Sequence, residues 1–194
     1  MRTLSLVLGV AMLATISDAR AASYFTLTSK SISDGARIPV KFGADDPKRP
    51  CKPGSTEICP CPGQNVSPHL AWTNAPEGTK SFAILMYDVD GQAGAGVSHW
   101  VAYNIAPTVH ELAEGDGTVG KNFTGGSGTR GNPNYIGPCP PRGDGPHHYL
   151  ITVVALDLGP TLAPGLTREA LLAAVKGHQL AASSIGGLFA RSYE

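Results

Sequence analysis

The segment from Tyr135 to Tyr149 constrains the fold most, because seven of its fifteen residues are proline or glycine and a hydrophobic run, 150–156, follows at once. Proline and glycine fix an irregular backbone at low entropic cost. The pattern therefore predicts a rigid loop that leads into a buried strand. Strand alternation places His147 and Tyr149 on one face of that strand. The alternative is a proline-rich turn with solvated histidines.

A second group of polar residues follows another core strand. Residues 81–87 are apolar enough for a buried strand, which ends in Asp88, Val89 and Asp90. A glycine-rich loop comes next, and then a second strand that begins near His99. Polar residues at a strand end beside such a loop are typical of binding sites. The alternatives are an aspartate that bonds its own turn and a histidine satisfied in the core.

These motifs, in this order, resemble the phosphatidylethanolamine-binding protein family, in the bacterial branch often labelled Raf kinase inhibitor-like. The resemblance covers about residues 24–191. It rests on ordered matches that are more specific than one short motif. They are Asn65-Val66-Ser67-Pro68, Leu70, Trp72, Asp88, Asp90, His99-Trp100, Tyr135, Gly137-Pro138, Pro140-Pro141, Gly143, His147, Tyr149, 155–157, Gly177-His178 and 187–191. Val89 and Gly91 depart from the prolines that the family usually has around its acidic residues.

The resemblance implies a mainly β fold, with a large antiparallel sheet packed on a smaller one and helical elements toward the C-terminus. It also implies a small anion-accepting pocket for phospholipid head groups, phosphate-like anions or phosphorylated side chains. Trp100 and Tyr135 would pack beneath this pocket, and His148 would point away from it. Carried over by position, the ligand-binding residues are Asp88, Asp90, His99, Gly137, Pro140, Pro141, His147 and Tyr149.

The residue types fit binding of a phosphate-bearing ligand. Imidazoles, hydroxyls and backbone amides donate hydrogen bonds to phosphate, while an aspartate suits a cationic part of the ligand. Binding of an anion should strengthen as the pH falls and a histidine gains its proton near pH ~6.5. The function expected is an exported binding protein without a cofactor, with modulation or inhibition of an unknown protein partner as a family trait.

The alternative is a hydrolase or metal-dependent enzyme that uses the aspartate and histidine cluster. The chain has no Gly-x-Ser-x-Gly elbow, no His-Glu-x-x-His motif and no phosphate-binding P-loop. Ser67, which precedes Pro68, carries no signature of a nucleophile. The sequence therefore favours a binding protein over an enzyme and predicts no metal site.

Charge excludes some partners. The chain has 15 basic and 15 acidic residues, so it offers neither an electrostatic footprint for nucleic acid nor a polybasic membrane patch. Its length of 194 residues suits one domain.

The first residues are typical of a secretory signal peptide. Met1-Arg2 is a short basic start, residues 4–16 form an apolar run too short for a membrane span, and Ala19-Arg20-Ala21 fits a cleavage site. We expect residues 1–21 to be removed, leaving a single soluble domain, 22–194, in the periplasm or outside the cell. The alternative is a buried N-terminal helix. No other apolar segment is long enough for an integral membrane helix.

Export would permit disulfides among the four cysteines, Cys51, Cys59, Cys61 and Cys139. Cys59 and Cys61 lie too close to pair comfortably with each other. We expect Cys51 to pair with Cys59, which leaves Cys61 and Cys139 as a second pair or as thiols near the pocket rim. A zinc site is disfavoured because the usual Cys-x-x-Cys spacing is absent.

Alternation and β-branched or aromatic content predict strands near 24–28, 38–42, 69–72, 81–88, 99–105 and 149–156, with a last short one at 185–189. One helix is expected after Thr167, a favourable N-cap, and should end near Gly177.

Overall fold

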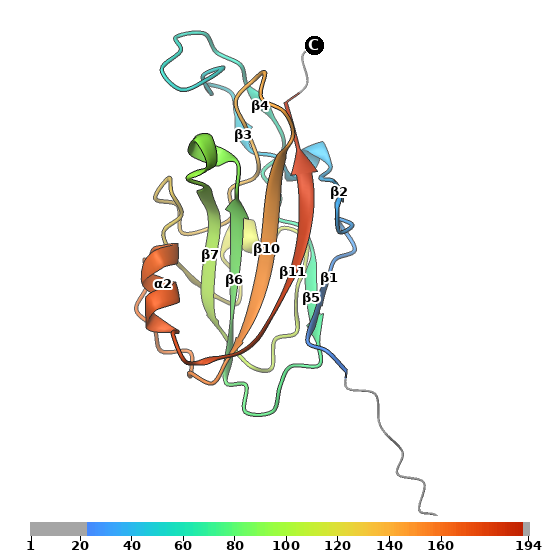
Figure 1. Cartoon of the computed structure of the whole chain (residues 1–194), viewed down its shortest axis with the longest axis vertical. Coiled ribbons are helices and arrows are strands. Elements are labelled where there is room, and N and C mark those ends of the chain that lie inside the picture. The colour runs from blue at the N-terminus through green and yellow to red at the C-terminus, as the bar shows by residue number, and fades with distance from the viewer. Residues whose placement is uncertain (1–22, 192–194) are drawn as a thin grey trace, which may run out of the picture.

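The computed structural model describes residues 23–191, so the expected signal peptide lies outside the described residues. A six-stranded sheet dominates the fold, with the order β2-β11-β10-β6-β7-β9 (Figure 1). All of its neighbours are antiparallel except β2 and β11, which run parallel. Its strands are β2 (Ala36–Arg37), β6 (Ser81–Asp88), β7 (Val97–Ile105), β9 (Thr124–Gly125), β10 (His147–Leu156) and β11 (Gln179–Phe189).

The inner face of the large sheet packs against a three-stranded sheet of order β1-β5-β8. The contact is apolar and includes an edge-to-face pair, Trp72 on Phe82, with ring centroids 5.3 Å apart. These strands are β1 (Thr26–Thr28), β5 (Leu70–Thr73) and β8 (Glu111–Leu112). The observed architecture therefore confirms the expected fold class.

The outer face of the large sheet is covered by helix α2 (Arg168–Ala174). Leu171 and Val175 pack there against Leu85 and Val101. Burial on both faces explains why β6 is a nearly continuous apolar run rather than an alternating one. Thr167 caps the helix as expected, since its Oγ1 accepts a hydrogen bond from the Ala170 amide at 3.2 Å.

Two expected strands differ from the structure. Residues 38–42 were expected to form a strand, but Val40–Phe42 form a 3-10 turn, η1, closed by the Phe42 amide on the Pro39 carbonyl at 3.0 Å. The last strand is also much longer than the expected 185–189. Its first half, 179–184, is rich in small and polar residues and largely exposed, so no apolar alternation marks it.

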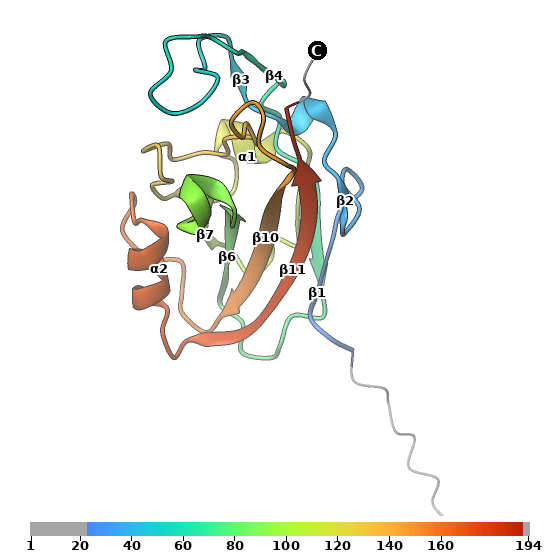
Figure 2. The same ribbon diagram turned by 45° about the horizontal axis from the view of Figure 1, so that its top comes forward.

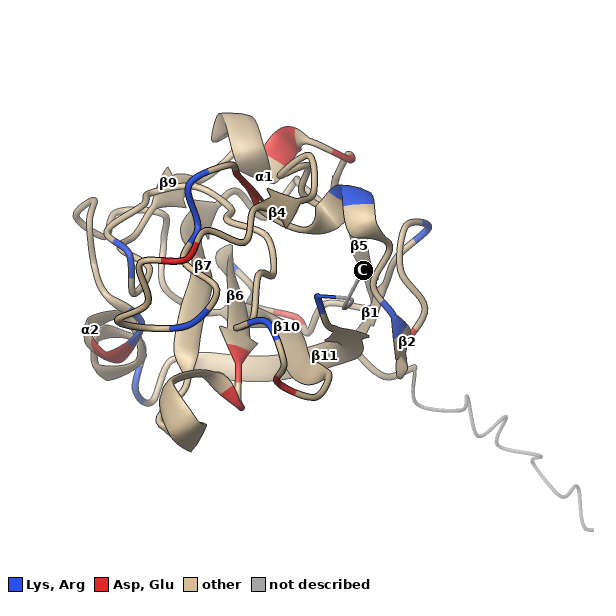
Figure 3. Cartoon of the chain, turned by 90° about the horizontal axis from the view of Figure 1, so that it is seen from above, with Lys and Arg blue, Asp and Glu red and all other residues tan. Residues whose placement is uncertain are grey.

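The connections at one end of the large sheet gather around the start of β10 and the end of β6 (Figure 2). They include the two-stranded β3 (Asp45–Asp46) and β4 (Cys61–Pro62), the 3-10 segment η2 (Gly91–Gly94) and the short helix α1 (Asp116–Val119). The end of the described chain lies at the same end of the molecule (Figure 1). Figure 3 looks down on this end, where both basic and acidic residues lie on the loops. No helix within 23–191 is both long and apolar enough to cross a bilayer.

Candidate functional site

The two histidine motifs converge on one cavity at this end of the sheet. Asp88 ends β6, His99 lies near the start of β7 and His147 begins β10. All three are buried and line a cavity of about 280 Å³, with Pro140 and Pro141 on another wall. The antiparallel register of the neighbouring strands brings them together, because the end of β6 lies beside the starts of β7 and β10.

The carboxylate of Asp88 divides its two oxygens between the loop and the histidines. Oδ1 accepts hydrogen bonds from the backbone amides of Asp90 and Gly91, both at 3.0 Å. Oδ2 lies 2.8 Å from Nδ1 of His147 and 4.0 Å from Nε2 of His99. Asp88 therefore makes the turn hydrogen bonds that one alternative expected and also contacts His147 in the cavity.

His147 has a defined orientation. A carboxylate only accepts, so Nδ1 of His147 donates its proton to Asp88. The other ring nitrogen, Nε2, lies 3.4 Å from Oδ2 of Asp144, whose side chain is half exposed. His147 can thus offer Nε2 toward the cavity as an acceptor when neutral and as a donor when protonated.

His99 acts as a neutral acceptor. Its Nδ1 donates to the Ile136 carbonyl at 2.9 Å, since a carbonyl oxygen only accepts. Burial lowers the pKa of His99 to about 4, against the opposing pull of the Ile136 bond and the Asp88 charge. At neutral pH its Nε2 therefore faces Asp88 as a lone pair. His99 is therefore not the histidine that would gain a proton near pH 6.5 and then hold an anion.

The ring of Tyr149 supports both imidazoles from below. Its centroid lies 5.3 Å from His99 in an edge-on arrangement and 6.5 Å from His147 in a stacked one. The hydroxyl is buried without a hydrogen-bond partner among the described residues. Burial raises the pKa of Tyr149, and the negative charge of Asp88 raises it further. Tyr149 is thus a neutral support beneath the cavity rather than part of its lining.

Trp100 and Tyr135 are buried beside each other, with ring centroids 5.8 Å apart. The hydroxyl of Tyr135 donates to the Phe42 carbonyl at 2.6 Å. Gly137 also packs rather than lining the cavity. A Cβ added there would lie 2.2 Å from the Phe42 carbonyl oxygen, so only glycine allows these two backbone segments to touch.

Asp90 lies outside the cavity. Its Oδ2 accepts from the backbone amide of His148 at 2.6 Å and lies 2.9 Å from the ring Nδ1 of His148. These bonds lower the pKa of Asp90, the backbone bond most. His148 is exposed and points away from the cavity, as strand alternation requires. Five of the eight candidates thus line the cavity, Tyr149 and Gly137 support it, and Asp90 fixes the neighbouring turn.

The sequence analysis missed both basic residues that line the cavity, Arg49 and Arg130. Each is a lone basic residue in an irregular loop, and no periodicity or motif marks either one. Within residues 23–191 neither guanidinium makes a hydrogen bond or an ion pair. Burial lowers the pKa of Arg130, as does the positive charge of Arg49, although arginine stays protonated in proteins. The cavity is therefore cationic at its mouth.

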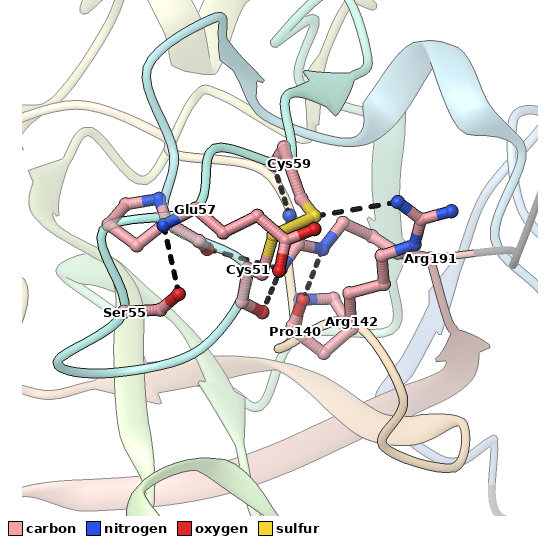
Figure 4. Close-up of a disulfide and its surroundings, with 8 residues drawn as sticks. Cys51, Ser55, Glu57, Cys59, Pro140, Arg142 and Arg191 are labelled. Carbon is pink, nitrogen blue, oxygen red and sulfur yellow. Dashed lines mark hydrogen bonds between the residues drawn. A yellow bond between two sulfur atoms is a disulfide. The ribbon is translucent and has the colours of Figure 1, made fainter.

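The expected Cys51–Cys59 disulfide is present, and of the two alternatives for Cys61 and Cys139 the structure has the second pair. Cys51 pairs with Cys59, and Cys61 pairs with Cys139, which lies on the cavity wall. Glu57 lies with Cys51 and Cys59 in a group whose donor atoms are within 4.8 Å of one another (Figure 4). Metal binding there would need thiolates, and both sulfurs are bonded to each other instead.

The guanidinium of Arg191 fastens residues 49–62, here called the disulfide loop, to the cavity wall. It is buried and donates to the carbonyls of Pro140, Cys51 and Cys59, with the Pro140 contact at 2.6 Å and the Cys51 contact at 2.8 Å. The wall of the cavity formed by residues 49–53 and 139–141 is thus held by two disulfides and one arginine.

This fold and site define a class of protein: a two-sheet β protein with a small, mixed-charge cavity at one end of its large sheet. The chain belongs to the phosphatidylethanolamine-binding protein family, whose family model matches residues 28–190.

Similar proteins come from distant organisms. A UPF0098 protein of Aquifex aeolicus is 38% identical over 138 residues, which cover 70% of this chain and 80% of the relative. LppC of Mycobacterium tuberculosis, named as a candidate lipoprotein, is 36% identical over 149 residues, covering 77% of this chain and 64% of the relative. The crystal structure of Escherichia coli YbcL, described as a new member of the mammalian family, superimposes with a TM-score of 0.75. The two chains are 29% identical, with 88% of this chain and 100% of YbcL covered.

Proposed function

We propose that this chain is a binding protein whose cavity takes a phosphate-bearing small molecule or a phospholipid head group. One observation carries the proposal: two histidines from separate motifs and the carboxylate of Asp88 meet in a cavity whose mouth holds two unpaired arginines. The arginines attract an anion, and His147 adds a hydrogen-bonding nitrogen.

The negative charge of Asp88 is compatible with an anionic ligand. Asp88 already accepts from two backbone amides and from His147, so its charge is partly neutralised by donors. The lone pair of His99 provides an acceptor for an O–H or N–H group of the ligand. A phosphate with an ammonium or hydroxyl group nearby would satisfy both the mouth and the floor of the cavity.

We propose binding without turnover. The contact between His147 and Asp88 has the geometry of a general-base pair, which keeps hydrolysis as the alternative. However, the one hydroxyl among the described lining residues, that of Thr129, accepts from the Ser98 amide at 2.8 Å and is not bonded to His147. The base therefore lacks an adjacent nucleophile.

Calorimetry with glycerophosphoethanolamine, together with a turnover assay on p-nitrophenyl phosphate, tests the proposal. We expect saturable binding, at least tenfold weaker in His147→Ala, and no release of nitrophenol. His178→Ala is the matched control, because His178 makes the same 2.8 Å contact with an aspartate, Asp157, outside the cavity. Equal isotherms for wild type and His147→Ala would overturn the proposal, and turnover lost in His147→Ala would favour the hydrolase.

We further propose that the protein works in the periplasm or outside the cell. The leader-like residues 1–21, the two disulfides and the similarity to LppC support this. The intact mass of exported material should lack residues 1–21, and retention of these residues in exported protein would contradict the proposal. We also propose that the protein modulates a partner protein, and the family resemblance is the sole support for this part.

A further inference from the structure

We propose that Arg49 and Arg130 form a cationic pair that makes the cavity select small phosphomonoesters over phosphodiesters. This inference rests on the proposed function, since it names the ligand class of the same cavity.

Both arginines line the cavity that holds Asp88 and His147, yet they come from loops far apart in the sequence. The two guanidinium charges act on one another: burial lowers the pKa of Arg130 most, and the positive charge of Arg49 lowers it further. Of the residues described, no carboxylate lies within ion-pair distance of either guanidinium. The negative charge of Asp46 acts on Arg130 without forming an ion pair with it, so two like charges beside one cavity stay available to an anionic ligand.

Other arginines of the chain are used differently. Arg191 donates to backbone carbonyls, and Arg168 lies over the ring of Tyr87 at 4.3 Å. Arg37 is exposed on β2, away from the cavity. The pair is thus distinguished by unused donors that lie beside the cavity.

The floor of the cavity, Asp88 and His99, offers no positive charge to an anion. The arginines at the mouth must therefore bind the negative charge of the ligand. Asp88 repels an anion, and His99 is neutral. A phosphomonoester carries about −1.5 to −2 charges at pH 7 and three terminal oxygens, whereas a diester carries one charge and two such oxygens. Each guanidinium presents several N–H groups in a planar fork that matches phosphate oxygens. Two forks can therefore be filled by a monoester and only partly by a diester.

The position of Arg49 depends on the disulfide loop. Its carbonyl accepts from the Cys59 amide at 2.8 Å, directly beside the Cys51–Cys59 bond, and the Cys51 carbonyl accepts from Arg191. The disulfide loop thus brings the guanidinium of Arg49 to the cavity. The strands of the large sheet supply no such group there.

The test compares O-phosphoethanolamine with glycerophosphoethanolamine by calorimetry, since both carry the same ammonium group and differ in the phosphate. We expect wild type to bind the monoester roughly tenfold more tightly. Arg49→Gln and Arg130→Gln should each weaken monoester binding by about fivefold or more and diester binding by less than about twofold. Arg37→Gln removes the same charge from the distant β2 and should change neither affinity. Arg49→Lys, which keeps the charge and loses the fork, should restore only part of the preference.

The outcomes separate this inference from the proposed function. Equal affinity of wild type for the two ligands, or a preference that survives Arg49→Gln and Arg130→Gln together, would overturn the inference and leave the proposed function standing. An equal loss in Arg37→Gln would also overturn it, because the effect would then come from net charge. Failure of wild type to bind either ligand would remove the proposed function itself.

Discussion

At the scale of single residues, close backbone contact matters as much as the polar groups. Gly137 lies where the cavity loop crosses residues 42–44, and its amide donates to Oδ1 of Asn65 at 2.8 Å. Gly137 was expected to bind ligand, and that stays a prediction; the structure shows it in close backbone contact and outside the cavity lining. Gly137 therefore helps to build the site although it does not line the cavity.

Gly137→Ala should destabilise the fold by about 3 kcal/mol, because the added Cβ meets backbone atoms that cannot rotate away. Gly145→Ala is the control in the same loop, since a Cβ there has no heavy atom within 4 Å. Urea unfolding of the two variants measures the difference. Equal stability would mean that the 42–44 backbone yields easily.

Acidification should destabilise the protein through His99. The unfolded chain takes up this proton near pH ~6.5, whereas burial keeps His99 neutral in the native state until about pH 4. The unfolded state therefore binds more protons between these values, and stability falls by up to about 3 kcal/mol as the pH drops across them. Asp88, Arg130 and Tyr149 are the charged or titratable groups that act on His99 or pack on it.

Urea unfolding from pH 7.5 to 4 checks this expectation with His99→Asn, in which an amide can still donate to the Ile136 carbonyl. The stability advantage of wild type over the variant should shrink steadily below pH 6.5. An advantage that stays constant would show that His99 is protonated in the native state as readily as in the unfolded chain.

The polar residues of the cavity could be predicted from the sequence only where a motif carried them. Asp88, His99 and His147 stand at strand ends, so alternation and order along the chain placed them correctly on one site. Asp90 has the same chemistry two residues later, but its turn directs it to His148. Arg49 and Arg130 enter the cavity from irregular loops, and their placement depends on tertiary contacts that no local pattern records.

At the scale of elements, the disulfide loop is held in place by cross-links and hydrogen bonds rather than by strand pairing with the large sheet. Residues 49–62 pair with little of the main sheet and are held by the two disulfides and by Arg191. The cation of Arg191 has no carboxylate partner within residues 23–191 and is neutralised by carbonyl dipoles alone. Its loss should be felt first in this loop.

Arg191→Met should expose the amides of residues 49–62 to hydrogen exchange while β6 and β10 stay protected. Three carbonyls would lose a charged donor, for which we expect a cost of about 2–5 kcal/mol. Arg37→Met, on exposed β2, is the control. Faster exchange in β10 instead of the loop would show that Arg191 stabilises the sheet.

Element boundaries followed the sequence where a strong apolar run or a cap marked them. The predicted range for β6 agrees with the structure because burial on both faces makes it a nearly continuous apolar run, and α2 begins where predicted because Thr167 caps it. The long β11 was underestimated, since half of it is exposed and rich in small residues. The segment 38–42 has the composition of a strand, but Pro39 and the closing bond from Phe42 turn it instead.

At the scale of the whole molecule, the second disulfide spans far more chain than the first. Cys51 and Cys59 are 8 residues apart, and Cys61 and Cys139 are 78 apart. Loop-closure entropy gives about 2.5 kcal/mol for the short bridge and about 4.5 kcal/mol for the long one. Cys61→Ser with Cys139→Ser should therefore destabilise more than Cys51→Ser with Cys59→Ser.

Urea unfolding of the two double variants under oxidising conditions measures this order, and the fully reduced wild type provides the reference. A larger loss from the short bridge would mean that the disulfide loop, rather than chain entropy, dominates the stability of the fold.

The two bridges also follow one another along the chain without overlapping. A chain threaded N-terminus first into an oxidising compartment presents Cys51, Cys59 and Cys61 together, long before Cys139 emerges. Early oxidation can then involve only the first three cysteines, and one of them must wait as a thiol. When a mistaken bridge includes Cys61, the remaining thiol is Cys51 or Cys59, and it can attack that bridge and exchange it for the native Cys51–Cys59 bond, which leaves Cys61 free. The arrival of Cys139 consumes the thiol and ends the exchange, which makes closure of the cavity wall the event that locks the pairing.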